Sequence, residues 1–153
     1  MKRWGILLAV LFLAAWKIFP SRDVGDLQPI EVLYVYPRAG LICIDSDTGD
    51  RGAGRTAGEA FRDLRQRASG EVFLDTADYL LLSPGMESEL DDLWRELRPG
   101  CRVCWAIGSP DLEQVGAFLS AHEPETTLLL LRSGAETLPI LRTTEGGMHF
   151  AKP

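Results

Sequence analysis

Short apolar runs alternate with segments that repeat apolar residues at helical spacing, and this alternation most constrains the fold. Each run is short enough for a strand, and each intervening segment has one apolar face. A chain that alternates strands and helices packs the helices against a sheet, so we expect an α/β fold. The expected strands are 30–36, 40–45, 72–74, 79–82, 101–107 and 126–131, followed by a terminal hairpin of 138–143 and 148–151.

Three helices are expected between these strands. The first begins at Thr56, whose hydroxyl forms a capping box with Glu59 three residues later. The second carries a stripe of leucines and a tryptophan over residues 90–97, and the third begins with Ser109 as N-cap and Pro110 in its first turn. We therefore predict a mixed β-sheet covered by three helices, with an α+β arrangement as the alternative.

Residues 4–19 form a hydrophobic segment that predicts one N-terminal transmembrane helix. No charge interrupts residues 4–16, and Trp4 and Trp16 suit the aromatic belts of a membrane. The helix would span about 24 Å, short of a ~30 Å hydrocarbon core but tolerable with local thinning. A cleaved signal peptide and a buried core helix are the alternatives. The segment lacks a clear small-residue cleavage site and a polar face, which favours an uncleaved anchor.

The chain divides into a membrane anchor or signal-like segment (1–19), a linker (20–29) and one globular domain (30–153). A length of 153 residues suits a single domain. Two cations precede the anchor and favour an N-inside orientation. We therefore expect a single-pass protein of the cell membrane, with its globular domain on the non-cytoplasmic side.

The charge of the chain excludes one class of partner. The formal net charge is −6, and binders of nucleic acid need a basic face that displaces counterions. With 46% hydrophobic and 25% charged residues, the chain is globular. We expect a protein partner at the membrane and no nucleic acid.

One short motif resembles a phosphate-binding loop. Gly49, Gly54, Arg55 and Thr56 have the spacing of G-x-x-x-x-G-K-[ST] between a strand and a helix, with arginine in place of lysine. Arginine is a bulkier planar group than lysine, and no expected strand ends in an aspartate that could hold Mg²⁺. We interpret the segment from residue 48 to 55 as a loop before a capped helix. Nucleotide or phosphate-ligand binding through segment 49–56 is the alternative.

The acidic residues and histidines predict neither a metal site nor an active site. Asp45, Asp47 and Asp50 suggest a calcium loop, but the glycine precedes Asp50 where such a loop needs the reverse order. A solvated acidic turn is the better interpretation. His122 and His149 have no nucleophile motif beside them. We therefore expect no enzymatic activity and no cofactor.

The cysteines are expected to be structural. Three is an odd number, which excludes a complete disulfide framework. Cys101 and Cys104 lie on an expected strand, where an odd separation places the two side chains on opposite faces. No second pair completes a zinc site. Cys43 and Cys104 stand among apolar residues, and we expect both to be protected by burial.

A longer pattern resembles a known family. Gly54, Thr56, Glu59, Ala60 and Leu64 match the G-x-T-x-x-E-A-x-x-x-L helix start in the N-terminal domain of the Ger(x)C family, the C subunits of bacterial spore germinant receptors. The order of strands and helices is similar over residues 40–122.

This chain departs from the family in two ways. It lacks the lipoprotein cysteine after the hydrophobic segment and the larger C-terminal region, so we expect a single-domain relative. The resemblance implies a non-enzymatic interaction domain of spore germination or sporulation. It also implies germinant-receptor subunits as partners.

The expected topology is testable by protease protection. Residues from about Ser21 onward should lie outside the cell, because the cations before the anchor hold the N-terminus inside. Protease added to intact protoplasts should remove the domain and leave a short N-terminal stub, detected by an N-terminal tag. A domain that survives until the membrane is permeabilised contradicts this orientation and strengthens the nucleotide-binding alternative.

Overall fold

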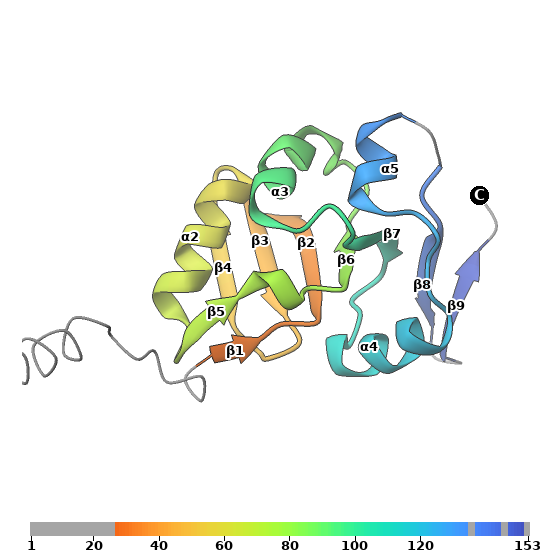
Figure 1. The fold of residues 1–153 in the computed structure, drawn as a ribbon, viewed down its shortest axis with the longest axis horizontal. Helices are drawn as coiled ribbons and strands as arrows, with labels where there is room; N and C mark the ends of the chain where they lie inside the picture. The colour runs from red at the N-terminus through yellow and green to blue at the C-terminus, as the bar shows by residue number, and fades with distance from the viewer. Residues whose placement is uncertain (1–26, 135–136, 145–146, 152–153) are drawn as a thin grey trace, which may run out of the picture.

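The computed structural model describes residues 27–134, 137–144 and 147–151 (Figure 1). The expected anchor and most of the expected linker lie outside these ranges. Within them, no helix is long and apolar enough to cross a bilayer.

A mixed β-sheet forms the centre of the domain, as predicted. Its strands are β2 (Val32–Arg38), β3 (Leu41–Ser46), β4 (Arg51–Gly54), β6 (Tyr79–Leu82), β7 (Arg102–Ile107), β8 (Ile140–Thr144) and β9 (Gly147–Ala151). These seven strands lie in the order β4-β3-β2-β6-β7-β8-β9. The pairings from β2 through β6 and β7 to β8 are parallel, and β2–β3, β3–β4 and β8–β9 are antiparallel.

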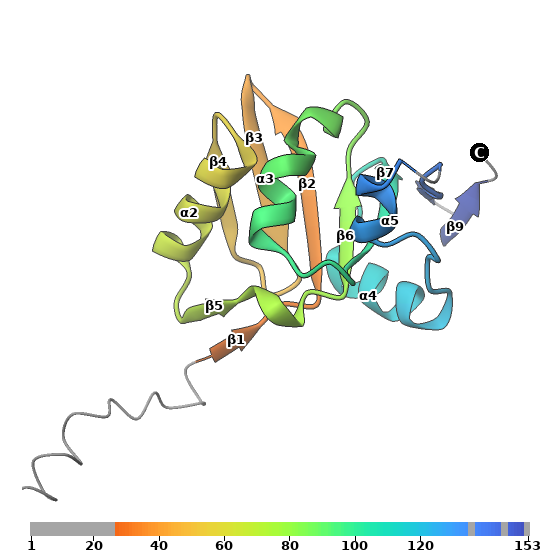
Figure 2. The same ribbon diagram turned by 45° about the horizontal axis from the view of Figure 1, so that its top comes forward.

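Helices cover the two faces unequally. The α-helices of the described residues are α2 (Ala57–Arg67), α3 (Leu90–Glu96), α4 (Leu112–Ala121) and α5 (Leu128–Arg132). There are also two short 3₁₀ helices: η2 (Leu74–Thr76) precedes β6, and η3 (Glu87–Glu89) leads directly into α3. The helices α2, α3 and α5 pack on one face, and α4 packs on the other (Figures 1 and 2).

Strand β6 explains why both faces need cover. All four of its residues are buried, and they alternate between the two cores. Leu80 and Leu82 pack beneath α2 and α3, whereas Tyr79 and Leu81 pack beneath α4. A continuous apolar run is typical of a parallel strand buried on both sides. The predicted strand 79–82 is therefore confirmed.

The expected linker is wrong at its last three residues. Leu27–Pro29 form β1, which pairs in parallel with β5 (Glu71–Phe73) as a separate two-stranded sheet. A polar stretch with proline did not predict a strand, but proline is tolerated in short edge strands, where a missing N–H costs little.

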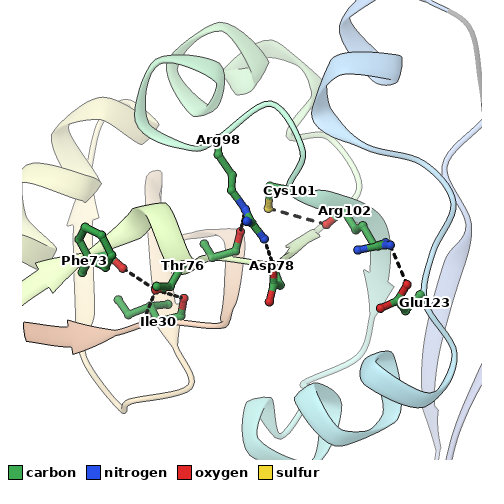
Figure 3. Close-up of polar contacts among 9 residues, drawn as sticks. Ile30, Phe73, Thr76, Asp78, Arg98, Cys101, Arg102 and Glu123 are labelled. Carbon is green, nitrogen blue, oxygen red and sulfur yellow. Dashed lines mark hydrogen bonds and ion pairs between the residues drawn. The ribbon is translucent and has the colours of Figure 1, made fainter.

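Hydrogen bonds from Thr76 hold this small sheet to the start of β2 (Figure 3). The Thr76 hydroxyl accepts from the Ile30 amide at 3.1 Å. It also lies 3.0 Å from the carbonyl oxygen of Ile30 and 2.9 Å from that of Phe73, so its proton has two acceptors. Nearby, Arg98 donates to the Ala77 carbonyl at 3.1 Å and pairs with Asp78. We call the Thr76 contacts the Thr76 clip.

The expected strand 126–131 is a helix. Leu128–Arg132 form α5, and the Thr127 hydroxyl accepts from the Leu130 amide at 3.4 Å as its N-cap. The Arg132 guanidinium lies over the Trp94 ring at 4.6 Å, which attaches α5 to α3. A run of leucines has no period that separates a buried strand from a short helix, and this explains the fourth helix.

The third expected helix begins two residues later than predicted. Asp111, not Ser109, is the N-cap of α4, and its carboxylate accepts from the amides of Glu113 and Gln114.

The expected loop of residues 48–55 is also wrong, because Arg51–Gly54 form the edge strand β4. Its small residues have low strand propensity, so the sequence pattern concealed the strand. They are small for a packing reason. A Cβ added at Gly52 would lie 2.2 Å from the carbonyl oxygen of Ala60, and one at Gly54 would lie 2.5 Å from the Ala60 amide. Helix α2 therefore packs almost directly on the strand backbone.

Gly52→Ala should destabilise the domain by about 1–3 kcal/mol, because the new methyl group must push α2 away from β4. Gly100→Ala is the matched control. A Cβ there meets nothing within 4 Å, so the change should be neutral or stabilising by less than about 1 kcal/mol. Urea unfolding followed by tryptophan fluorescence measures both variants. Equal unfolding midpoints would contradict the close approach of α2.

Candidate functional site

The candidate site is the half of the sheet that α4 leaves uncovered. Side chains on β2, β3 and β4 alternate, so every second residue points away from α2. Within the described part of the chain, the apolar cluster around α4 includes no residue of β3 or β4. We call this surface the open face. It consists of Tyr34, Tyr36, Arg38, Leu41, Cys43, Asp45, Arg51 and Ala53, all half-buried or exposed, and Tyr34 at its border also packs against the α4 cluster.

Two stacked tyrosines on β2 lie at the side of the open face that is next to α4. The rings of Tyr34 and Tyr36 lie 4.8 Å apart between centroids, with an interplanar angle of 22°. Tyr34 donates to the Gly108 carbonyl at 3.3 Å. Tyr36 donates to Asp45 Oδ2 at 3.2 Å, and Asp45 faces Arg51 Nε at 3.6 Å. These contacts hold both rings in place before any ligand arrives.

Burial, followed by smaller effects that include the charge of Asp45, raises the pKa of both tyrosines above the ordinary value of 10.0. Both phenols are therefore neutral near pH 7 and act as hydrogen-bonding groups. The third reactive group of the face, Cys43, pairs across the strands with Tyr36 and Ala53 and not with a base.

The residues of the phosphate-loop alternative do not form one loop. Gly49 lies in the turn before β4 with a φ of +86°, and Gly54 lies at the far end of that strand. Only Arg55 and Thr56 stand at the start of α2, where Thr56 is the N-cap. Gly54, Arg55 and Thr56 are thus adjacent, and strand β4 separates Gly49 from them.

The amides at the start of α2 are already occupied by carboxylates of the chain itself. Ala57 N donates to Glu89 Oε2 at 2.9 Å, and Gly58 N donates to Asp92 Oδ2 at 3.1 Å. Arg55 N donates to Glu59 Oε2 at 2.8 Å. A helix N-terminus attracts anions through such amides. A phosphate there would have to displace these carboxylates.

Cys101 and Cys104 face opposite sides of the sheet, as predicted. Cys101 packs in the core beneath α2 and α3, and Cys104 packs beneath α4. Burial raises the pKa of both thiols to about 12. The thiolate is the reactive form, so both are inert near neutral pH. The expectation for Cys43 is wrong: it is half-buried, because its side chain lies on the open face.

The acidic residues of the proposed calcium loop have separate partners. Asp47 accepts from the Glu31 amide at 3.2 Å, Asp50 accepts from the Thr48 hydroxyl at 3.0 Å, and Asp45 belongs to the open face. Across the described ranges, no three His, Cys, Asp or Glu side chains form a group that could hold a metal ion.

The two histidines lie apart from the open face. His122 follows α4, and its ring stacks on Phe118 with centroids 4.6 Å apart. His149 lies on β9 opposite Arg142.

Sequence reasoning missed the open face. The alternation of aliphatic residues with Tyr, Cys or Asp in 33–36 and 42–45 was a usable signal, since it indicates strands with one less buried side. The position of α4 decides which part of that side stays uncovered, and no local pattern carries this information.

Comparison with known proteins gives no match: no family model, no curated protein and no solved structure is similar to this chain at a significant level.

A thiol reagent should distinguish the three cysteines in the folded protein. Cys43 should react, because it is half-buried on the open face, whereas Cys101 and Cys104 should react only after unfolding. Mass spectrometry of peptides labelled at pH 8 with and without denaturant measures this. Cys43→Ser should abolish labelling of the folded chain. Native-state labelling of Cys101 or Cys104 at a comparable rate would contradict the burial described above.

Proposed function

We propose that this chain is a non-enzymatic, membrane-tethered interaction domain that binds a protein partner through its open face. The observation that carries the proposal is the uncovered half of the sheet, where a pair of stacked tyrosines is held in place beside exposed Leu41.

The chemistry of this surface supports protein binding. Tyrosine and arginine are enriched at the centres of protein interfaces, because they combine apolar contact area with hydrogen-bonding groups. Tyr34 and Tyr36 supply two such rings, and Arg38 and Arg51 flank them. Since the rings are already stacked and hydrogen-bonded, a partner loses little side-chain entropy in ordering them.

An apolar contact lies at the end of the same surface. Leu41 is 41% exposed at the start of β3, directly opposite Arg38 in the β2–β3 hairpin. An apolar side chain and a cationic one therefore lie next to each other at this end of the face. This pattern fits a partner with both apolar and acidic side chains.

The resemblance to the Ger(x)C domain is the ground for naming a class of partner. Subunits of a germinant receptor, held in the same membrane by their own anchors, are the first candidates. Tethering both partners to one bilayer raises their effective concentration, so a modest interface is sufficient.

Leu41→Arg should weaken partner binding by about tenfold or more, because it places a charge where an apolar contact is buried. The tagged full chain is purified in detergent from its native cells during sporulation, and recovered germinant-receptor subunits are quantified by mass spectrometry. Gln66→Arg adds the same charge to an exposed site on α2 and should leave recovery unchanged.

Two outcomes contradict the proposal. One is recovery of no membrane or spore protein by the unmodified chain. The other is equal recovery of the same partner by the Leu41→Arg and Gln66→Arg variants, which would place the interface elsewhere.

A further inference from the structure

The two edge strands of the main sheet, β4 and β9, differ in whether their outward backbone amides already have partners. At the β4 edge, Ala53 N donates to Asp63 Oδ2 at 2.9 Å, and Arg55 N, two residues along, donates to Glu59 Oε2 at 2.8 Å. Glu59 and Asp63 lie one turn apart on α2, so a single helix face occupies both amides. The Ala53 amide, followed by Arg67, holds the pKa of Asp63 below its usual value. These two amides at the β4 edge are therefore not available to pair with the strand of another molecule.

The β9 edge has no such protection among the described residues. β9 is the last strand of the sheet order, so its outer backbone groups pair with no described strand. Its five residues, Gly147-Met-His-Phe-Ala151, contain no proline, lysine or acidic residue, and Lys152 and Pro153 follow only after the strand in the sequence. Native proteins usually block an edge with such residues, because an exposed edge is a template for another strand.

We propose that β9 is a self-association edge: it pairs antiparallel with β9 of a second copy of this chain, joining the two sheets into one. A second copy fits because only one of the two edges is free. A main sheet with two free edges can propagate into a fibre, whereas pairing of the β9 edges of two main sheets leaves neither of these edges free. The contact is therefore isologous and closes at a dimer.

One register aligns all five residues of both strands. It places His149 opposite the second copy's His149, and Met148 opposite the second copy's Phe150. Side chains directly opposite in an antiparallel pair share one face of the sheet. Met148 and Phe150 pack against the cluster around α4, where the Phe118 and Phe150 rings lie 5.6 Å apart. This register thus extends one apolar surface across the junction.

Cysteine cross-linking tests both the edge and the register. Residues directly opposite have Cα atoms about 4.5–5.5 Å apart, within the range that a disulfide bridges, whereas diagonal neighbours are about 7–8 Å apart. In the full chain with Cys43→Ser, purified in detergent and mildly oxidised, His149→Cys should give a disulfide-linked dimer. Met148→Cys alone should not. A mixture of Met148→Cys chains and Phe150→Cys chains should restore the dimer.

Arg142→Cys is the matched control, because it adds a cysteine on the inner strand β8, directly opposite His149. The fraction of disulfide-linked dimer should be several-fold higher for His149→Cys than for this control. Cross-linking of His149→Cys no greater than the control overturns the proposal, as does equal dimer from Met148→Cys alone and from the mixture.

Analytical ultracentrifugation of the chain without substitutions measures its oligomeric state, and this tests the proposal even if a variant fails to fold. In detergent it should show a dimer at the highest soluble concentration, and a monomer there overturns the proposal. This dimer is independent of the open face. Leu41→Arg should leave it intact, so failure of one proposal is distinguishable from failure of the other.

Discussion

The burial of β6 on both faces is the constraint on which the rest of the domain depends. A strand with four buried residues needs apolar cover on each side. Three helices supply that cover on one side, and α4 alone supplies it on the other. A single short helix cannot shield seven strands, and the remainder becomes the open face. The candidate surface is thus a result of how few helices the second layer contains, and its tyrosines are the residues that tolerate a half-covered position.

The packing of α2 on β4 explains a sequence pattern that otherwise resembles a ligand site. Gly52 and Gly54 are needed because the helix backbone approaches within a distance that no side chain permits. Carboxylates from α2, η3 and α3 then satisfy the amides at the helix start and at the strand edge. Helix α2 therefore covers the core and occupies amides at the edge of the sheet, while η3 and α3 satisfy the first amides of α2 itself.

The parts of this fold that the sequence predicted are those with a strong local period or a defined cap. The helix capped by Thr56 and the terminal hairpin belong to this class, whereas strand 79–82 is a continuous apolar run whose strand assignment was correct although its pattern has no period. Strand β4 and helix α5 were misassigned, because a glycine-rich strand and a run of leucines take their structure from tertiary contacts. The phosphate-loop residues match the spacing of the motif but do not form a phosphate-binding loop in the structure. The open face could be recognised only once the position of α4 was known.

The Thr76 clip also has a mechanical consequence. β1 is the first element of the described chain, and Ile30 connects it directly to β2, at the centre of the main sheet. A pull on the chain before residue 27 therefore loads the β1–β5 pairing and the hydrogen bonds between Ile30 and Thr76 before it reaches β2. These contacts lie between the point of pulling and the main sheet, so such a load must break them before it acts on β2 directly.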